Sequence, residues 1–132
     1  MVTAISSQAT RVGLALFEYD FATHGGAIGT IVIGANRLPI GAIVLDGIIH
    51  VKTAPTSGDA ATVALHVMTS EDILAATAIA TLTLNSLHDT VCVGTAATAI
   101  RCTSAKGLSF VIGAYTLTAG NIVVGLRYID TA

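Results

Sequence analysis

Four histidines are the first residues that could do chemistry, because a neutral imidazole can bind a metal ion or transfer a proton. They are His24, His50, His66 and His88. No pair has the His-x-His or His-x₃-His spacing of a metal site, and each comes from a different segment of the chain. The pattern favours single solvated or hydrogen-bonded histidines over a metal or proton-transfer site.

Glu18 and Asp20 share one face of a predicted strand, where paired carboxylates could serve glycoside hydrolysis or calcium binding. A sugar site normally adds aromatic platforms, and this chain has no Trp, three Tyr and three Phe. We therefore interpret the pair as the acidic end of a strand entering solvent. The same scarcity of aromatic residues counts against a carbohydrate-binding face.

The glycine-rich and cysteine-containing motifs do not indicate a catalytic or metal site either. The segment His24-Gly25-Gly26 is similar to the oxyanion loop of some esterases, but no Gly-x-Ser-x-Gly nucleophile elbow accompanies it. Cys92 and Cys102 are too few for a disulfide framework and lack four-ligand zinc spacing, so we expect two small buried hydrophobic residues. The sequence predicts no enzyme, no cofactor and no metal site.

Composition gives the strongest functional indication. Only 11% of the 132 residues are charged, against about 25% in an ordinary soluble domain, while 53% are hydrophobic. The six basic and eight acidic residues are spread singly along the chain, so no basic stripe exists to bind nucleic acid. We expect part of the apolar surface to be covered by other protein subunits.

We do not expect a membrane to cover this apolar surface. The longest apolar stretch, Ile73–Leu87, contains several polar residues and falls short of the roughly 20 apolar residues that a spanning helix needs. The first ten residues lack the basic flank and continuous apolar region of a secretory signal, which predicts synthesis in the cytoplasm. Residues 1–10 could instead form an extended arm on a single domain spanning 1–132.

Runs rich in Val, Ile, Thr and aromatic residues recur between Gly, Pro, Asn and Asp breaks, which predicts an all-β, antiparallel sandwich of jelly-roll-like type. We expect one short connecting helix at Ser70–Thr77, where Ser70 could cap the first turn. The predicted strands are Arg11–Phe21, Gly29–Ile33, Ala42–Thr53, Ala61–Met68, Ala78–Leu84, Thr90–Val93, Thr98–Thr103, Leu108–Tyr115 and Asn121–Asp130.

Two predicted strands are apolar on both faces, since successive side chains of a strand point to opposite sides of the sheet. In Val12–Tyr19, Leu14 and Leu16 point one way and Phe17 points the other, and Asn121–Ile129 shows the same property. A sandwich has one interior, so the second apolar face predicts a neighbouring subunit. The predicted interface residues are Leu14, Leu16, Phe17, Val124, Leu126, Arg127 and Tyr128.

Three stretches of the sequence resemble small structural proteins of tailed bacteriophages, of the type that decorates or cements the capsid. They begin at Asn36-Arg-Leu-Pro-Ile-Gly-Ala-Ile-Val-Leu-Asp-Gly, continue at Val51-Lys-Thr-Ala-Pro-Thr-Ser-Gly-Asp-Ala-Ala-Thr-Val-Ala-Leu, and close at Leu117-Thr-Ala-Gly-Asn-Ile-Val-Val-Gly-Leu-Arg-Tyr. The resemblance covers about a third of the chain. It implies a β-sandwich protomer, usually a trimer, that binds the major capsid protein on the virion surface.

Two alternatives stay open at this point. The chain could be a tail or fibre component of the same virion, although fibres favour repeated, elongated segments. It could also be a small jelly-roll module that binds glycans, in which case Tyr19, Tyr115 or Tyr128 would line an exposed pocket.

Overall fold

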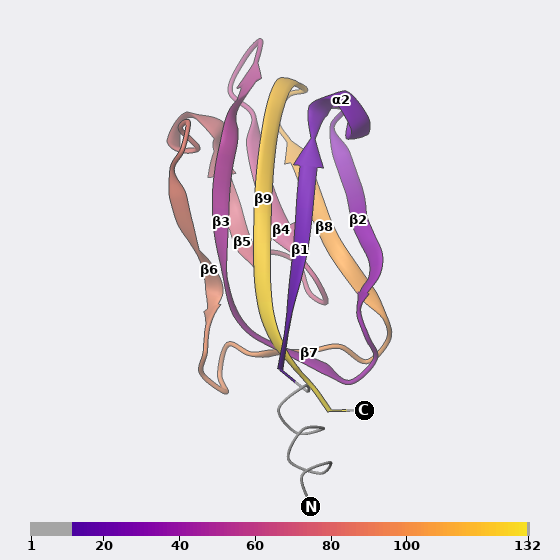
Figure 1. Cartoon of the computed structure of the whole chain (residues 1–132). Coiled ribbons are helices and arrows are strands. Elements are labelled where there is room, and N and C mark those ends of the chain that lie inside the picture. Colours follow the sequence, from indigo (N-terminus) through magenta and orange to yellow (C-terminus); the bar gives the residue numbers. More distant parts are fainter. Residues whose placement is uncertain (1–11, 132) are drawn as a thin grey trace, which may run out of the picture.

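The computed structural model describes residues 12–131, which form two antiparallel sheets packed face to face (Figure 1). Sheet A contains, in spatial order, β1 (Val12–Asp20), β9 (Leu117–Asp130), β3 (Ala42–Ser57) and β6 (Leu87–Val93), and the short β7 (Ile100–Arg101) also pairs with β3. Sheet B contains, in spatial order, β2 (Gly29–Leu38), β8 (Lys106–Gly113), β4 (Thr62–His66) and β5 (Leu74–Ala78). The predicted all-β sandwich is confirmed.

The chain passes repeatedly between the two sheets. Strands β1 and β9, far apart in the sequence, lie side by side along their length, from Val12 opposite Ile129 to Asp20 opposite Asn121. The described part of the chain therefore begins and ends at the same end of the sandwich (Figure 1). No helix in residues 12–131 is long and apolar enough to cross a membrane.

The core lies between the sheets, where the inward side chains of both layers meet. Within it two aromatic rings stack, Tyr19 from β1 and Phe110 from β8, with centroids 4.0 Å apart and planes 6° apart. Such aromatic contacts add to the gain from burying apolar area. The largest fully buried side chains are Tyr19, Phe17, Phe110, Leu38, Ile49, Leu65, Ile73, Leu82, Leu108, Ile112, Ile122 and Leu126.

The predicted helix at Ser70–Thr77 is wrong. Asp72 folds back instead, and its carboxylate accepts hydrogen bonds from the backbone N–H groups of Val67, Met68 and Thr69 at 2.7, 2.9 and 2.8 Å. Glu71 has a φ of 61°, outside the helical region. A side chain that satisfies backbone donors locally competes with helix formation, and the chain leaves this turn as strand β5.

The strand predicted at Ala78–Leu84 is also wrong, because this segment contains the 3₁₀ turn η1 (Ile79–Thr81). The short connecting helix lies elsewhere, at α2 (Phe21–His24). Asp20 caps it by accepting a hydrogen bond from the N–H of Ala22 at 3.2 Å. The other predicted strands each overlap an observed strand, and the predicted arm at 1–10 lies outside the described residues.

Candidate protein interface

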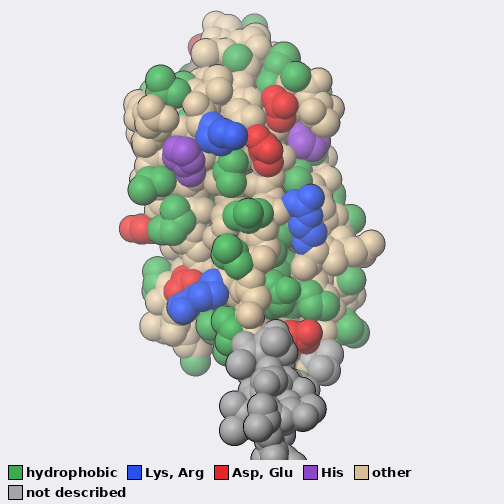
Figure 2. Space-filling view, in the orientation of Figure 1, with side chains coloured by type: hydrophobic (Ala, Val, Ile, Leu, Met, Phe, Trp, Pro, Cys, Tyr) green, Lys and Arg blue, Asp and Glu red, His purple; other side chains and the backbone are tan. Residues whose placement is uncertain are grey.

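The outer face of sheet A carries the side chains that point away from the core. Along β1 the side chains alternate between the two faces: Phe17 and Tyr19 are each 1% exposed, whereas Leu14 and Leu16 are 66% and 55% exposed. Figure 2, which views this face, shows hydrophobic side chains down its middle with a few charged side chains around them. The second apolar face of β1 therefore points to solvent.

Strand register places the outer side chains of sheet A in rows that cross the four strands. In these pairs Leu16 lies opposite Gly125, and Gly125 lies opposite Ile48. The three rows, each written from β1 to β6, are Leu14, Arg127, Asp46 and Val93; Leu16, Gly125, Ile48 and Asp89; and Glu18, Val123, His50 and Leu87. The middle of the face is thus apolar except for Asp89 on the edge strand β6, and the other charges lie toward its two ends.

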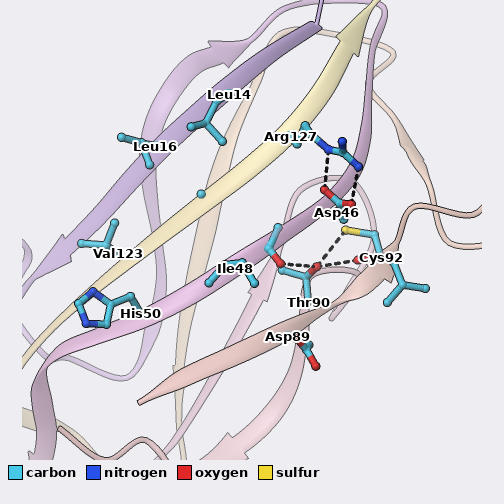
Figure 3. Close-up of a pocket in the computed structure, with 13 residues that line it drawn as sticks. Leu14, Leu16, Asp46, Ile48, His50, Asp89, Thr90, Cys92, Val123 and Arg127 are labelled. Carbon is cyan, nitrogen blue, oxygen red and sulfur yellow. Dashed lines mark hydrogen bonds and ion pairs between the residues drawn. The ribbon is translucent and has the colours of Figure 1, made fainter. Parts of the chain in front are cut away.

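A groove of about 600 Å³ runs across the middle of this face, and Figure 3 shows the side chains that line it. Gly125 forms part of its floor. A Cβ atom there would lie 3.4 Å from Leu16 Cδ2 and 3.7 Å from Leu14 Cδ1, which is ordinary contact distance. The groove therefore exists because position 125 has no side chain to fill the space beside the two leucines.

Gly47 has a different role beneath the same groove. A Cβ at this position would lie only 2.4 Å from the carbonyl oxygen of Gly125, so β3 and β9 approach too closely for any other residue. The pairing of β3 with β9 also shifts register between Val44 and Asp46. The local irregularity of β3 is therefore built around a glycine that the backbone requires.

The ends of the face carry two ion pairs. The guanidinium of Arg127 donates to both carboxylate oxygens of Asp46, with Nε–Oδ1 3.0 Å and Nη2–Oδ2 2.7 Å, and these hydrogen bonds raise the pKa of Arg127. Lys52 Nζ lies 3.7 Å from Glu18 Oε2, which also accepts a hydrogen bond from Asn121. Exposed pairs of this kind stabilise a fold little, but they fix where charge meets a partner.

The structure separates the predicted interface residues into two groups. Leu14, Leu16 and Arg127 lie on the outer face of sheet A. The side chains of Phe17, Val124 and Leu126 lie in the core, and Tyr128 is partly buried against it. An interface on the outer face can include only the first group, because the other side chains already pack against sheet B or the inner side of sheet A.

The groove is also lined by residues outside the predicted interface set, among them Ile48, Val123 and Gly125. Alternation along β3 was a usable signal, since Ile48 falls on the same face as Asp46 and His50. The contribution of Gly125 could not be found in this way, because a glycine forms a hollow only between large neighbours on the adjacent strands.

The outer face of sheet B differs in character. Its outward side chains are mostly small or hydroxylated, namely Thr30, Val32, Thr62, Ala64, His66, Ser109 and Val111. Val32 and Val111 are the larger apolar side chains of this set, and Val32 is 58% exposed. The apolar groove is therefore a property of one face of the sandwich.

The histidines do not form a common site. His24 accepts the N–H of Asp20 at 3.1 Å, His88 contacts Ser86 Oγ at 2.9 Å, and His50 lines the groove. Within residues 12–131, no group of three His, Cys, Asp or Glu side chains is arranged to hold a metal ion.

Both cysteines are buried, as predicted, and neither forms a disulfide. Burial raises the pKa of both thiols, which keeps them protonated and unreactive. Tyr19 is also buried, so it does not line an exposed glycan pocket. The arrangement that remains is a shaped, apolar surface with charged ends, which can bind a protein.

No protein-family model matches the sequence, and no curated protein matches it. Several chains of solved structures share the fold. A chain of the cyanophage Pam1 capsid asymmetric unit has a TM-score of 0.64 and 17% identity, covering 89% of this chain and 84% of that one. A chain of the acid-stable capsid of Helicobacter pylori bacteriophage KHP30 has a TM-score of 0.62 and 18% identity, with coverages of 92% and 89%.

A chain of the capsid of Ralstonia phage GP4 has a TM-score of 0.64 and 19% identity, covering 92% of this chain and 85% of that one. These TM-scores and coverages show a common fold across most of both chains. They agree with the resemblance to phage structural proteins that the sequence indicates.

Proposed function

We propose that this chain is a structural protein of a tailed-phage virion, which binds the outside of the capsid as a decoration or cement protein. The observation that carries the proposal is the fold, which is shared along most of its length with chains of three phage capsids. An exposed apolar groove on the same fold supplies the surface that such a protein needs. The proposed role involves no catalytic step and no cofactor.

The mechanism is burial of apolar area against the major capsid protein. Covering Leu14, Leu16 and Ile48 removes from water side chains that are each worth about 1.5 to 3 kcal/mol when fully buried. The ion pairs at the ends of the face set the orientation of docking. Attachment to several capsid subunits at once multiplies the effect, because each further contact forms at high effective concentration.

A homo-oligomer, with a trimer favoured, provides that multivalent attachment. The resemblance to decoration proteins supports this stoichiometry, and the charge-poor, apolar surface supports self-association in general. The chain would be made in the host cytoplasm and would act on the capsid surface, without contacting nucleic acid or membrane. Sedimentation of the purified full chain tests the stoichiometry: trimers are expected, and a chain that stays monomeric at high concentration contradicts it.

Cryo-electron microscopy of the parent particle tests the location. Density for the sandwich is expected on the outside of the head, with the outer face of sheet A against a neighbouring subunit. Density on the tail alone would show that the chain is a tail or fibre component.

Two matched substitutions test the surface. Leu16→Asp places a charge at the groove on sheet A, whereas Val32→Asp places the same charge at an equally exposed position on sheet B. With capsids of the parent phage that lack this protein, Leu16→Asp should weaken binding at least about tenfold per contact and Val32→Asp little. Equal binding by the two variants would exclude the sheet A groove as the contact.

A further inference from the structure

Strand β1 lies at an edge of sheet A, because it pairs with β9 on one side only. In an antiparallel ladder the N–H and C=O groups of alternate residues point away from the partner strand. Two hydrogen bonds show which residues these are: the carbonyl of Leu16 accepts from Arg37, and the N–H of Asp20 donates to His24. The peptide groups of Leu14 and Glu18 therefore face the same open edge.

An open edge of this length is a template for pairing with another strand. A groove of about 470 Å³ lies beside it, between β1 and β2, and is lined by Phe17, Glu18 and Ile33 among others. Its position at the open side of the sandwich leaves room next to the backbone of β1. A second strand could hydrogen-bond there if nothing covered the edge.

Arg37 is the side chain that covers it. It belongs to β2, in the other sheet, and its Nη1 donates to the carbonyl oxygen of Leu16, near the middle of β1. Its guanidinium carbon lies 5.8 Å from the centroid of the Phe17 ring. Arg37 thus occupies an acceptor that an added strand would need and lies across the path of that strand.

The backbone of β2 is irregular at the place that lets Arg37 reach across. The pairing of β2 with β8 shifts register between Ile33 and Leu38, and Gly34 has a φ of 58°. A Cβ on Gly34 would lie 2.7 Å from Arg37 Cδ, so the arginine stem packs directly on the glycine. A bulge that redirects one side chain onto an exposed edge is a recognised means of protecting that edge.

We propose that Arg37 keeps the edge of β1 closed against pairing with the β1 strand of a second copy of this chain. The inference goes beyond the proposed function, since it concerns an association that the chain avoids rather than one that it makes. Sheet A would otherwise extend from one copy into the next, and the exposed leucines of β1 would add to the contact. With the edge closed, subunits meet through side chains on the faces of the sandwich.

The test is Arg37→Met in the purified full chain. Methionine keeps an unbranched stem against Gly34 and Phe17, and it removes the donor to Leu16 and the charge. The weight-average mass from sedimentation should rise with concentration above that of the parent chain. Hydrogen exchange of the Leu14 and Glu18 amides should slow at the same time. A mass and exchange pattern unchanged from the parent chain would overturn the proposal.

A second variant separates edge pairing from misfolding. Proline at position 14 removes an N–H that faces the open edge and spares the ladder to β9, as edge strands tolerate. Arg37→Met combined with Leu14→Pro should return the mass to that of the parent chain. Association that persists in the double variant would show that the edge of β1 is not the surface involved. Arg101→Met, at an exposed arginine on β7, controls for loss of charge and should leave the mass unchanged.

Discussion

Both faces of strand β1 carry large apolar side chains, but the two faces have different surroundings. The inward face, with Phe17 and Tyr19, packs against sheet B, whereas the outward face, with Leu14 and Leu16, meets solvent beside the groove. Burial of the inward face stabilises the fold of the isolated chain, and burial of the outward face requires another molecule. One apolar face of β1 therefore completes the core, and the other is the surface that the proposed function assigns to a partner.

The largest expected effect contrasts the two faces directly. Phe17→Ala removes a ring that is 1% exposed and should lower the free energy of unfolding by about 3 to 5 kcal/mol. Leu16→Ala, one residue away on the outward face, should change it by no more than about 0.5 kcal/mol. Urea unfolding measures both, and equal losses would show that the outward face is packed in the chain alone.

A smaller effect, also on the inward face, depends on pH. Burial, with a further contribution from Asp20, raises the pKa of Tyr19 from 10.0 to about 12, and its hydroxyl donates to the carbonyl of Gly25. A raised folded-state pKa means that the stabilisation is complete below pH 10 and is lost as the pH rises to 12. The loss amounts to about 2 to 3 kcal/mol.

The matched variant is Tyr19→Phe, which has no phenol to ionise. The stability of the parent chain should fall more steeply than that of the variant between pH 10 and 12, as followed by urea midpoints. Parallel curves would mean that the hydroxyl ionises as easily in the folded chain as in the unfolded one.

The smallest effect concerns the floor of the groove. Gly125→Ala should raise the free energy of unfolding by about 0.5 to 1 kcal/mol, because its Cβ fits beside Leu16 and alanine loses less entropy on folding. Gly47→Ala should instead destabilise the chain, since its Cβ would meet the Gly125 carbonyl oxygen. Under the proposed function, Gly125→Ala should also weaken capsid binding, because the hollow becomes shallower.

Alternation of side chains made most of the fold predictable. The strands that alternate clearly, such as β1 and β3, are found close to the predicted positions. The segment around Asp72 was predicted wrongly because the Asp72 carboxylate accepts hydrogen bonds from three backbone N–H groups in a turn. Helix propensity does not include such competing hydrogen bonds. Local hydrogen bonding by one side chain outweighed a favourable helix start.

The candidate site was predictable only in part. Leu14 and Leu16 follow from the face on which they fall, whereas Val124 and Leu126 were assigned to an interface although they fill the core. Sequence gives the two faces of a strand but does not say which one meets the opposite sheet. The groove itself requires the register that sets Gly125 between Leu16 and Ile48.

The pairing of β1 with β9 also determines when this protein can fold. Phe17 finds its neighbour Val124 more than a hundred positions later in the chain, so sheet A cannot close until β9 has left the ribosome. Folding dominated by such distant pairings takes about milliseconds to seconds in small domains. During synthesis both apolar faces of β1 stay exposed until β9 has been made. The newly made chain is therefore most prone to aggregation before β9 pairs with β1.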